Sequence, residues 1–511
     1  VSLGYNGGST ANLPKGSLTM ASNTVFTVNG NGVFYVGESA GSDMTVNVNG
    51  NAQLIATGTG AKRIGAGGGG VMNVNDAALV NFAGNGAVSV GYASGSGTLN
   101  LNGGTMTIST PSSGAGIGLQ IAASTASGNV VTGVVNVASG ATLTSAGDCI
   151  IGVGGTQSGT LNLNGGVANI GTTATKWMIL GQYDTVSGIV NLNSGSLNLN
   201  AGTSIKFTTG STGTAGTNVF NQYGGNVTFY SDNGVTVGGT GDLNLQQSGS
   251  ALVNNTYNLN GGTLTVPQIG STLATGTRVF NFNGGTLKAA KANPTFMSLG
   301  AGNAVANVRN GGAVIDTAGF NVTIGQPLQH SALGGDSAVD GGLTKKGAGT
   351  LILSGANTYN GNTTVSGGTL ELALATLATN SVVTITNGAK LQLDFAVTNL
   401  VGALVLNGLT QPGGIYSSST TPAFLAGTGK LQVVSSIATS PTNISFAVSG
   451  STLTLSWPAD HTGWRLQAQT NAANTGLGTN WFDVPGAAET NSMNFPMDYS
   501  NGSVFYRLVF P

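Results

Sequence analysis

The sequence predicts an all-β chain, most of it a parallel β-helix in which short strands wind into a rod of stacked coils. Three observations lead to this fold class. An Asn between large apolar residues returns about every 29 residues, and an apolar residue that ends a short strand returns at the same mean step. Apolar and polar residues alternate, and no segment has helical spacing. The recurring residues are Asn47, Asn73, Asn100, Asn136, Asn162, Asn191, Asn221, Asn258, Asn281 and Asn307, of which Asn221 has an apolar neighbour on one side only.

Residues 98–108 show how one coil is expected to be built. Leu99 and Leu101 share one side of a strand, because side chains alternate with period two. Two glycines then turn the chain, and Met106 and Ile108 return to the inward side. We expect about 15 such coils, wound right-handed, with the repeated Asn side chains stacked about 4.8 Å apart as a ladder of amides on the outside of the rod.

The composition argues against two classes of function. Of 511 residues 86 are Gly and only 6% are charged, with 15 basic and 16 acidic side chains. So few Lys and Arg residues cannot neutralise many phosphates, so nucleic acid is not an expected partner. No run of about 18 apolar residues is present, and membrane insertion is not expected. The net charge of −1 leaves little repulsion between copies of the chain.

Nothing in the sequence predicts a cofactor, a metal site or a catalytic residue. Cys149 is the only cysteine, so an intrachain disulfide is impossible. Its apolar neighbours Ile150 and Ile151 predict a buried thiol. The chain begins at Val1 without Met, which suits a secreted protein whose signal peptide has been removed. We therefore expect a secreted protein, extracellular or on the cell surface.

The N-terminal end of the rod is expected to be open. Residues 1–30 are expected to form an N-terminal extension and the first coil, and residues 31–325 the repeats of about 29 residues. No amphipathic helix or charge cluster is present to cover the edge of the first coil. The irregular residues 1–18 either cap that edge or add a strand to a neighbouring copy. The candidate assembly residues are Val1, Leu3, Tyr5, Leu13 and Leu18.

Residues 326–434 are expected to continue the β-helix after an interruption that ends at residue 342. This interruption holds His330, Asp336 and Asp340 close together in the sequence. A His with two acids would suit a metal site or acid/base catalysis. However, the spacing matches no metal motif and the stretch is rich in turn residues, so a solvated loop is the favoured interpretation.

Residues 341–372, GGLTKKGAGTLILSGANTYNGNTTVSGGTLEL, carry a recognisable motif. They resemble the autotransporter-associated β-strand repeat, found in passenger-type β-helices of secreted bacterial proteins. The resemblance implies an extracellular β-helical fibre or adhesive stalk and brings no catalytic residues. The matching positions are Leu343, Thr344, Lys345, Gly347, Gly349, Thr350, Leu351, Leu353, Gly355, Asn357, Tyr359, Gly361, Thr363, Thr364, Val365, Gly367, Gly368, Leu370 and Leu372.

A different unit is expected at the C-terminal end. A linker rich in Ser, Thr and Pro at residues 435–442 leads into residues 443–511, where turn residues separate six candidate strands of a small β-sandwich. This module holds Trp457, Trp464 and Trp481, for which core packing is the favoured role and sugar stacking the alternative. The module resembles C-terminal modules of secreted planctomycete and verrucomicrobial proteins.

Three functions from different classes fit these features. The favoured hypothesis is an extracellular structural protein, a subunit of a surface fibre assembled head to tail through its β-helix ends and terminal segments, so that its main partner is itself. The alternative is an adhesin that binds glycans or a cell surface. A polysaccharide-degrading β-helix enzyme is the least favoured, because such enzymes need converging charged residues and the acids here are scattered singly.

Overall fold

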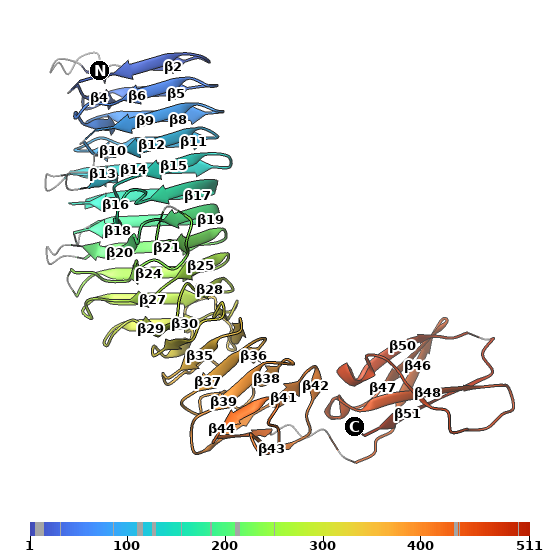
Figure 1. Cartoon of the computed structure of the whole chain (residues 1–511). Helices are drawn as coiled ribbons and strands as arrows, with labels where there is room; N and C mark the ends of the chain where they lie inside the picture. Colours follow the sequence, from blue (N-terminus) through green and yellow to red (C-terminus); the bar gives the residue numbers. More distant parts are fainter. Residues whose placement is uncertain are drawn as a thin grey trace.

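The chain forms a long rod of stacked parallel strands followed by a small separate module (Figure 1). This architecture confirms the predicted fold class, a parallel β-helix with a C-terminal β-sandwich. The computed structural model describes residues 1–510 except 6–14, 31, 85, 110–115, 125–128, 155, 184–185, 210–214, 233, 250, 434–437, 439 and 499.

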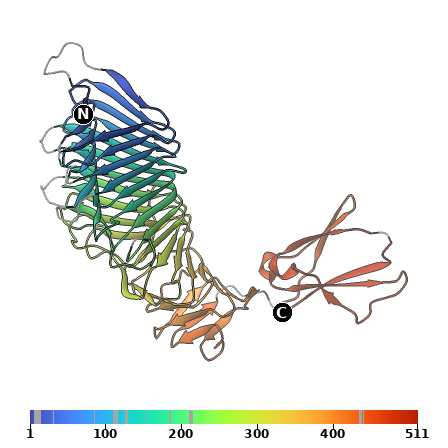
Figure 2. The ribbon, with the colours of Figure 1, turned by 45° about the horizontal axis from the view of Figure 1, so that its top comes forward.

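Within the described residues, one face of the rod is a parallel sheet of sixteen strands, which agrees with the expected number of about 15 coils. Figure 2 shows the coils of the rod following one another from the N-terminal end. The sixteen strands are β1 (Ser2–Leu3), β4 (Phe34–Val36), β7 (Lys62–Ile64), β10 (Val88–Tyr92), β13 (Ile117–Ala123), β16 (Asp148–Val153), β18 (Trp177–Gln182), β20 (Ser204–Thr209), β23 (Leu243–Asn244), β26 (Ile269–Gly270), β29 (Asn293–Ser298), β32 (Val322–Ile324), β35 (Thr350–Leu353), β37 (Thr369–Leu372), β39 (Lys390–Leu393) and β44 (Leu425–Gly427).

The remaining faces belong to a second sheet of 26 strands, to which most coils contribute two strands or one long bent strand. They are β2 (Lys15–Met20), β3 (Val25–Val28), β5 (Asp43–Val48), β6 (Gln53–Ala56), β8 (Gly69–Asn75), β9 (Leu79–Ala83), β11 (Gly97–Asn102), β12 (Thr105–Ser109), β14 (Val130–Ala138), β15 (Thr142–Ser145), β17 (Thr156–Ile170), β19 (Ser187–Leu199), β21 (Thr217–Gln222), β22 (Asn226–Phe229), β24 (Asn254–Leu259), β25 (Thr263–Val266), β27 (Thr277–Phe282), β28 (Thr286–Ala289), β30 (Ala304–Val308), β31 (Ala313–Asp316), β33 (Leu328–His330), β34 (Leu343–Lys346), β36 (Thr363–Val365), β38 (Val382–Ile385), β41 (Ala403–Leu406) and β42 (Leu409–Thr410).

Register between coils is set residue against residue. In β8, β11, β14 and β17 the recurring Asn of each coil lies directly opposite that of the next. Leu99, Leu101 and Met106 are fully buried, as the alternation predicts, because a one-residue slip would turn every inward side chain to solvent. The sequence repeat therefore becomes columns of equivalent side chains that run along the rod.

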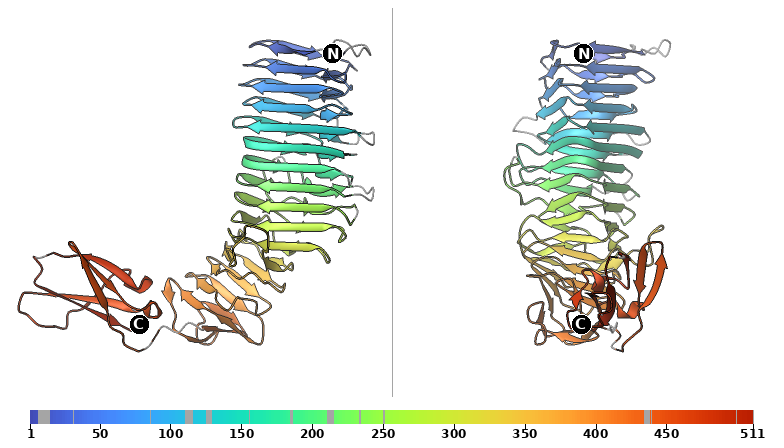
Figure 3. Two further views of the ribbon diagram at one scale, coloured as in Figure 1. Left: turned by 180° about the vertical axis from the view of Figure 1, so that it is seen from behind. Right: turned by 90° about the vertical axis from the view of Figure 1, so that its right-hand side faces the viewer.

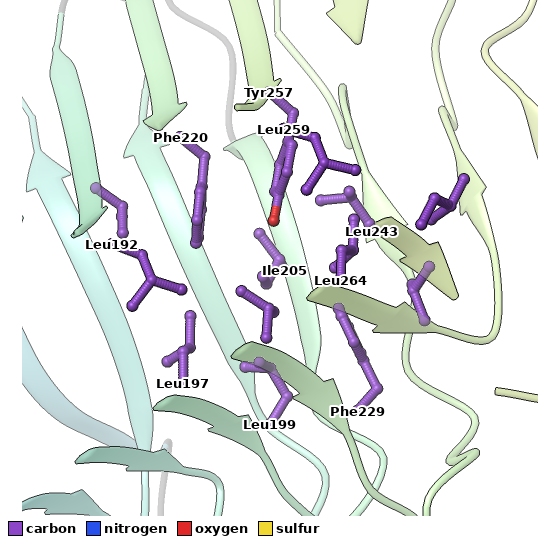
Figure 4. Close-up of a cluster of buried hydrophobic side chains, with 14 of the residues drawn as sticks. Leu192, Leu197, Leu199, Ile205, Phe220, Phe229, Leu243, Tyr257, Leu259 and Leu264 are labelled. Atoms are coloured by element: carbon purple, nitrogen blue, oxygen red, sulfur yellow. The ribbon is translucent and has the colours of Figure 1, made fainter. Parts of the chain in front are cut away.

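The core of the rod is one continuous column of apolar side chains. Figure 4 shows its middle, where Phe220 and Tyr257 from successive coils stack with ring centroids 4.7 Å apart. Tyr257 in turn stacks on Phe280 at 5.3 Å, and its buried hydroxyl donates a hydrogen bond of 2.7 Å to Gln222 Oε1. Aromatic rings suit this place, because the spacing between coils is close to the distance at which offset rings attract.

The two ends of the rod differ. At the C-terminal end β42 pairs antiparallel with β41, and a three-stranded sheet is made of β40 (Thr398–Val401), β45 (Lys430–Val433) and β43 (Gly414–Ser417). Figure 3 shows these last coils turning away from the axis of the first coils. Antiparallel β42 thus covers the outer edge of β41, whereas among the described residues no strand covers the outer edge of β1, β2 or β3.

The C-terminal module consists of two antiparallel sheets of three strands. Its small core holds Leu455, Trp457, Leu466 and Ala487. The strands are β46 (Ser445–Ser449), β47 (Thr452–Ser456) and β50 (Ser492–Pro496) in one sheet, and β49 (Phe482–Asp483), β48 (Arg465–Asn471) and β51 (Ser503–Val509) in the other.

Helices are almost absent from the part of the chain that is described. Two single turns of 3₁₀-helix, Ala459–His461 and Ala487–Glu489, both lie in the C-terminal module. No helix among these residues has the length and apolar character needed to cross a membrane.

Cys149 is fully buried, as its neighbours predict, and burial raises the pKa of its thiol to about 12.

The core column predicts that the effect of an added charge on stability depends on whether the position faces inward or outward. Leu161 is fully buried between Val135 and Val190, whereas the neighbouring Thr160 points outward. Leu161→Asp should lower the free energy of unfolding by at least about 3 kcal/mol, because it removes core contacts and buries an unpaired carboxyl. Thr160→Asp should change it by less than about 1 kcal/mol.

Hydrogen exchange measured along β14, β17 and β19 checks this prediction. The Leu161→Asp variant should lose protection in these three strands, since each coil is held mainly by its neighbours. Equal effects of the two substitutions would contradict the inward column at this coil.

Candidate functional sites

The recurring Asn side chains form one continuous chain of hydrogen bonds along the rod. Nine Nδ2 to Oδ1 bonds of 2.6 to 2.9 Å join the ten residues in sequence order, from Asn47 to Asn307. Each inner amide donates to one neighbour and accepts from the other. The bonds are possible because parallel pairing in register places identical side chains directly above one another.

This ladder has a direction. In every bond the Nδ2 belongs to the later coil and the Oδ1 to the earlier one. At the N-terminal end Asn47 donates to Thr19 Oγ1 of the first coil over 3.4 Å. Because the amide dipoles are aligned, each bond polarises the next and strengthens it.

The ladder is less exposed than an outward position suggests. Eight of the ten side chains belong to half-buried residues, and Asn281 and Asn307 are only 3% and 9% exposed. Stacked amides about 4.8 Å apart cover one another on two sides, which leaves only their edges to water. The last two members, Asn281 and Asn307, are therefore covered although they alternate with inward-facing residues.

Shorter ladders run beside the long one, and the sequence analysis missed them. Asn75 donates to Asn49 and Asn102 donates to Asn75, at 2.7 and 2.9 Å. Further pairs join Asn193 to Asn164, Asn198 to Asn169, and Asn283 to Asn260. The signal for most of them was present, since Asn-X-Asn places two amides on one side of a strand.

Asn162 provides a test of the ladder. Its amide donates to Asn136 and accepts from Asn191, so Asn162→Ala should lower the free energy of unfolding by about 1–3 kcal/mol. Asn162→Asp should be more destabilising at pH 7, because a carboxylate places an acceptor against the Asn136 oxygen. Thr160→Ala is the matched control on the same strand.

The Asp variant should also gain stability as pH falls. The protonated carboxyl can donate to Asn136, so the folded state raises the carboxyl pKa above its unfolded value. The folded chain then binds more protons, and stability decreases as pH rises through that window. Thermal melting from pH 3 to pH 7 would contradict the ladder if Asn162→Asp and Asn162→Ala followed the same curve.

The three titratable residues of the interrupted segment are held by structural contacts. The buried Asp340 carboxylate accepts backbone hydrogen bonds of 2.8 to 2.9 Å from Gly342, Asn360 and Gly361, and lies 3.0 Å from His330 Nδ1. A carboxylate with its oxygens occupied in this way orders two successive turns. It has no free oxygen position with which to act as a general base.

Asp336 has a separate partner in Arg309. The guanidinium contacts both carboxylate oxygens, at 2.9 to 3.2 Å, and this charge-assisted pair lowers the pKa of Asp336. The side chains of Asp336 and Asp340 are 4% and 1% exposed, so the interpretation of a solvated loop is wrong for both. No group of three His, Cys, Asp or Glu residues suited to a metal lies among the described residues.

The recognised motif at residues 341–372 combines an apolar stripe with a buried cation. Its alternating leucines, such as Leu351 and Leu370, fill the core. Lys345 is also fully buried, and its Nζ donates to Thr317 Oγ1 at 3.1 Å and to the carbonyl oxygens of Lys346 and Gly367 at 2.9 Å. These acceptors belong to three successive coils, so the ammonium group joins the turns at one corner of the rod.

Two other polar motif residues also stabilise turns. The buried Tyr359 hydroxyl lies 2.9 Å from Thr363 Oγ1, and burial raises the pKa of the phenol to about 12. The Asn357 side chain accepts a hydrogen bond of 2.9 Å from the backbone N–H of Leu328. Gly347 adopts φ +79°, and a Cβ there would lie 2.4 Å from Asp316 Oδ1, so the turn beside Lys345 requires glycine.

Lys345 predicts a pH dependence of stability. Burial lowers the pKa of its ammonium group to about 8 from 10.5. Between these values the unfolded chain binds more protons than the folded chain, so the contribution of Lys345 to stability increases with pH. The unfolding free energy of the natural chain minus that of Lys345→Met should rise by about 3 kcal/mol between pH 8 and pH 10.5. Denaturant titrations at several pH values measure this difference. A difference that stays constant or falls with pH would contradict a lowered pKa for Lys345.

The candidate assembly residues at the N-terminal end lie mostly in the first coil. Leu3 pairs with Val36 through β1, and both Leu3 and Leu18 pack against the core while staying half-buried. Tyr5 is 64% exposed and Val1 is 44% exposed. Leu13 lies outside the described residues. The supposedly irregular segment is thus partly regular, because it supplies β1 and most of β2.

The tryptophans of the C-terminal module differ in exposure. Trp457 and Trp464 are 3% and 4% exposed, so neither presents an open face to a sugar. The Trp464 indole N–H donates to Ala438 O at 2.8 Å, which ties the described end of the predicted linker to the module. Trp481 is half-buried, with the Arg507 guanidinium 4.3 Å above its ring.

A cation between aromatic rings lies on the outer side of the sixteen-stranded sheet, where sequence reasoning found no site. The Arg63 guanidinium is 3.5 Å from the ring centre of Tyr92 and 5.0 Å from that of Tyr35. A hollow of about 200 Å³ adjoins it, with Ser89 and Gln120 in its lining. These residues come from four successive coils, and no local motif signals their meeting.

Comparison with known proteins agrees with the motif. Residues 343–372 match the model of the passenger-associated-transport repeat. Over 249 residues the chain is 32% identical to the adhesin BmaC autotransporter of Brucella suis biovar 1 (strain 1330), a stretch that covers 45% of this chain and 6% of that relative. The chain thus spans only a small part of the relative. No solved structure matches the chain.

These matches support the resemblance to autotransporter passenger repeats. They also confirm the expected location, so the protein is secreted or displayed at the cell surface. The resemblance of the C-terminal module to planctomycete and verrucomicrobial modules stays a prediction.

Proposed function

We propose that this protein is a non-enzymatic structural subunit of an extracellular fibre, in which rods join head to tail. The observation that carries the proposal is the open first coil. Among the described residues β1, β2 and β3 each pair with a strand on one side only, namely β4, β5 and β6. The backbone groups on their other side can bond to an added strand.

Side chains of the first coil support the same conclusion. Leu3, Leu18 and Phe26 point to the core but remain half-buried, whereas inward residues of the middle coils are fully buried. Val25 is 60% exposed at the same end. A further layer of protein against this end would remove the remaining apolar surface from water.

The matching surface is proposed to be β46 of the C-terminal module in the next copy. Within the described residues this strand pairs only with β47, and all five of its residues are exposed. Phe446 and Val448 are 75% and 55% exposed. A contact between two different surfaces does not close on itself, so it continues into an open filament.

The edge of the first coil can be tested without removing any strand. Ser17→Lys and Thr27→Lys place charges on exposed positions of β2 and β3, where lysines discourage strand addition. The double variant should remain monomeric in light scattering at concentrations where the natural chain forms long particles. Deletion of residues 436–511 should have the same effect.

A matched control uses the same two columns in an inner coil. Thr98 and Thr107 lie in register with Ser17 and Thr27 through the intervening coils, so Thr98→Lys with Thr107→Lys adds the same charge away from the edge. This control should still assemble. A natural chain that stays monomeric at high concentration would overturn the proposal.

Adhesion is the second candidate function. The relative is named an adhesin, and the outer face of the rod carries the unusual cluster around Arg63. A long rod displayed on a cell would hold such a site at a distance from the cell surface. The two functions are compatible, because strand addition uses the end of the rod and the cluster lies on its side.

A further inference from the structure

We propose that the cluster around Arg63 is a binding site for the carboxylate of an acidic sugar in a polysaccharide. The inference deepens the adhesive function proposed above by naming a site and a ligand class. It does not depend on how the rods assemble. The Arg63 site comprises Tyr35, Arg63, Ser89, Tyr92 and Gln120.

The Arg63 guanidinium is held in place by aromatic rings. It lies 3.5 Å from the centre of the Tyr92 ring and 5.0 Å from that of Tyr35. Tyr92 also packs against an apolar cluster on the same outer face that includes Ile150 and Ile179. A ring fixed on one side by apolar contacts and on the other by a cation restricts the guanidinium to few orientations.

The donors of Arg63 are unused. Among the described residues the Arg63 side chain has no hydrogen-bond or ion-pair partner, in contrast to the side chains of the other four arginines. Arg309 and Arg465 pair with Asp336 and Asp483, and Arg507 and Arg278 bond to acceptors. A half-buried, oriented guanidinium without a counter-charge is suited to an added anion, because its planar fork matches the two oxygens of a carboxylate.

Polar groups continue from Arg63 along the sheet. Arg63, Ser89 and Gln120 occupy one column in three successive coils, a span of about 10 Å. Ser89 Oγ donates to Gln120 Oε1 at 3.2 Å, which leaves the Gln120 amide nitrogen as a donor group. Ala61 and Ala87 line the adjoining hollow of about 200 Å³ with small side chains. The hollow therefore offers donors to hydroxyl oxygens beside a single cation.

The charges around Arg63 favour one class of ligand over others. Nucleic acid needs several cations spaced along its phosphates, and the column holds one. The lining residues of the hollow include no acid, so a metal ion would find no charged ligand there. One carboxylate per sugar ring, flanked by hydroxyl groups, fits one guanidinium flanked by a serine and a glutamine.

Calorimetric titration of the full-length chain tests the site. The probes are tetramers of galacturonic, glucuronic and mannuronic acid, each beside its methyl ester, which removes the charge and keeps the ring. At least one acid tetramer should bind, and its ester should bind about 30-fold more weakly or not at all. Arg63→Gln should reduce affinity for the acid to the level of the ester, and Arg63→Lys should reduce it about ten-fold, because Lys lacks the fork.

Arg507→Gln is the matched control. Arg507 also lies over an aromatic ring, Trp481, but it bonds to Gln467. This variant should bind the acid tetramer as the natural chain does. If Arg63→Gln melts within a few degrees of the natural chain, its loss of binding does not come from loss of folding. If Arg63→Gln melts at a much lower temperature, Arg63→Lys is the variant on which the test depends.

Two outcomes overturn the inference. If no acid tetramer binds, or if Arg63→Gln and Arg63→Lys bind as the natural chain does, the Arg63 site is not the binding site. Glycan binding that persists in the Arg63 variants but is lost in Arg507→Gln would move adhesion to the C-terminal module. That result would leave the adhesive function standing while this site fails.

Discussion

Backbone pairing in register between successive coils is the constraint on which the rest of this structure depends. It places equivalent residues about 4.8 Å apart along the whole rod, so each side chain must be compatible with a copy of its own kind above and below. Leu and Val satisfy this requirement by apolar contact, aromatic rings by stacking, and Asn by donating to one neighbour and accepting from the other. Few other side chains can meet it many times in succession, which explains why the sequence repeats so few residue types.

The buried Lys and Arg side chains of the rod lie where their charged groups can turn away from the apolar core toward polar backbone groups. Lys62, Arg278 and Lys345 are almost fully buried, yet each turns its charged group to backbone carbonyl oxygens in loops or at strand ends, as Arg278 does to Leu273 O at 3.1 Å and Lys62 to Ala83 O at 2.8 Å. A buried cation at such a corner donates to several carbonyl oxygens at once. Burial also lowers the pKa of the Lys345 ammonium group. Lys345 belongs to the recognised repeat at residues 341–372.

The parts of the fold that obey the register could be predicted from the sequence, and the parts that depend on single contacts could not. The period, the inward leucines such as Leu99, and the equivalence of the Asn positions follow from alternation and repetition. The meeting of Tyr35, Arg63 and Tyr92 does not, because these residues are unlike one another and come from three coils. Neither does the closure of the C-terminal end, where β42 reverses direction and the period stops. The proposed sites lie where the repetition fails, so the repeat pattern alone does not reveal them.

Stacking also explains the low charge of the chain, and through it the importance of the ends. Two like charges in neighbouring coils repel by about 0.9 kcal/mol even in water, and by about 3.5 kcal/mol near a protein surface. Where charges do fill a column they alternate in sign, as in Lys288, Asp316 and Lys346, or in Lys15 and Asp43. Columns of neutral amides and hydroxyls avoid the problem, but they leave the sides of the rod with little charge to keep copies apart. In the proposed assembly, association depends on the edge strands. In the described part of the chain, antiparallel β42 covers one strand of the last coils, whereas β1, β2 and β3 each pair on one side only. A rod with two such different ends has a polarity, and polarity is what head-to-tail growth requires.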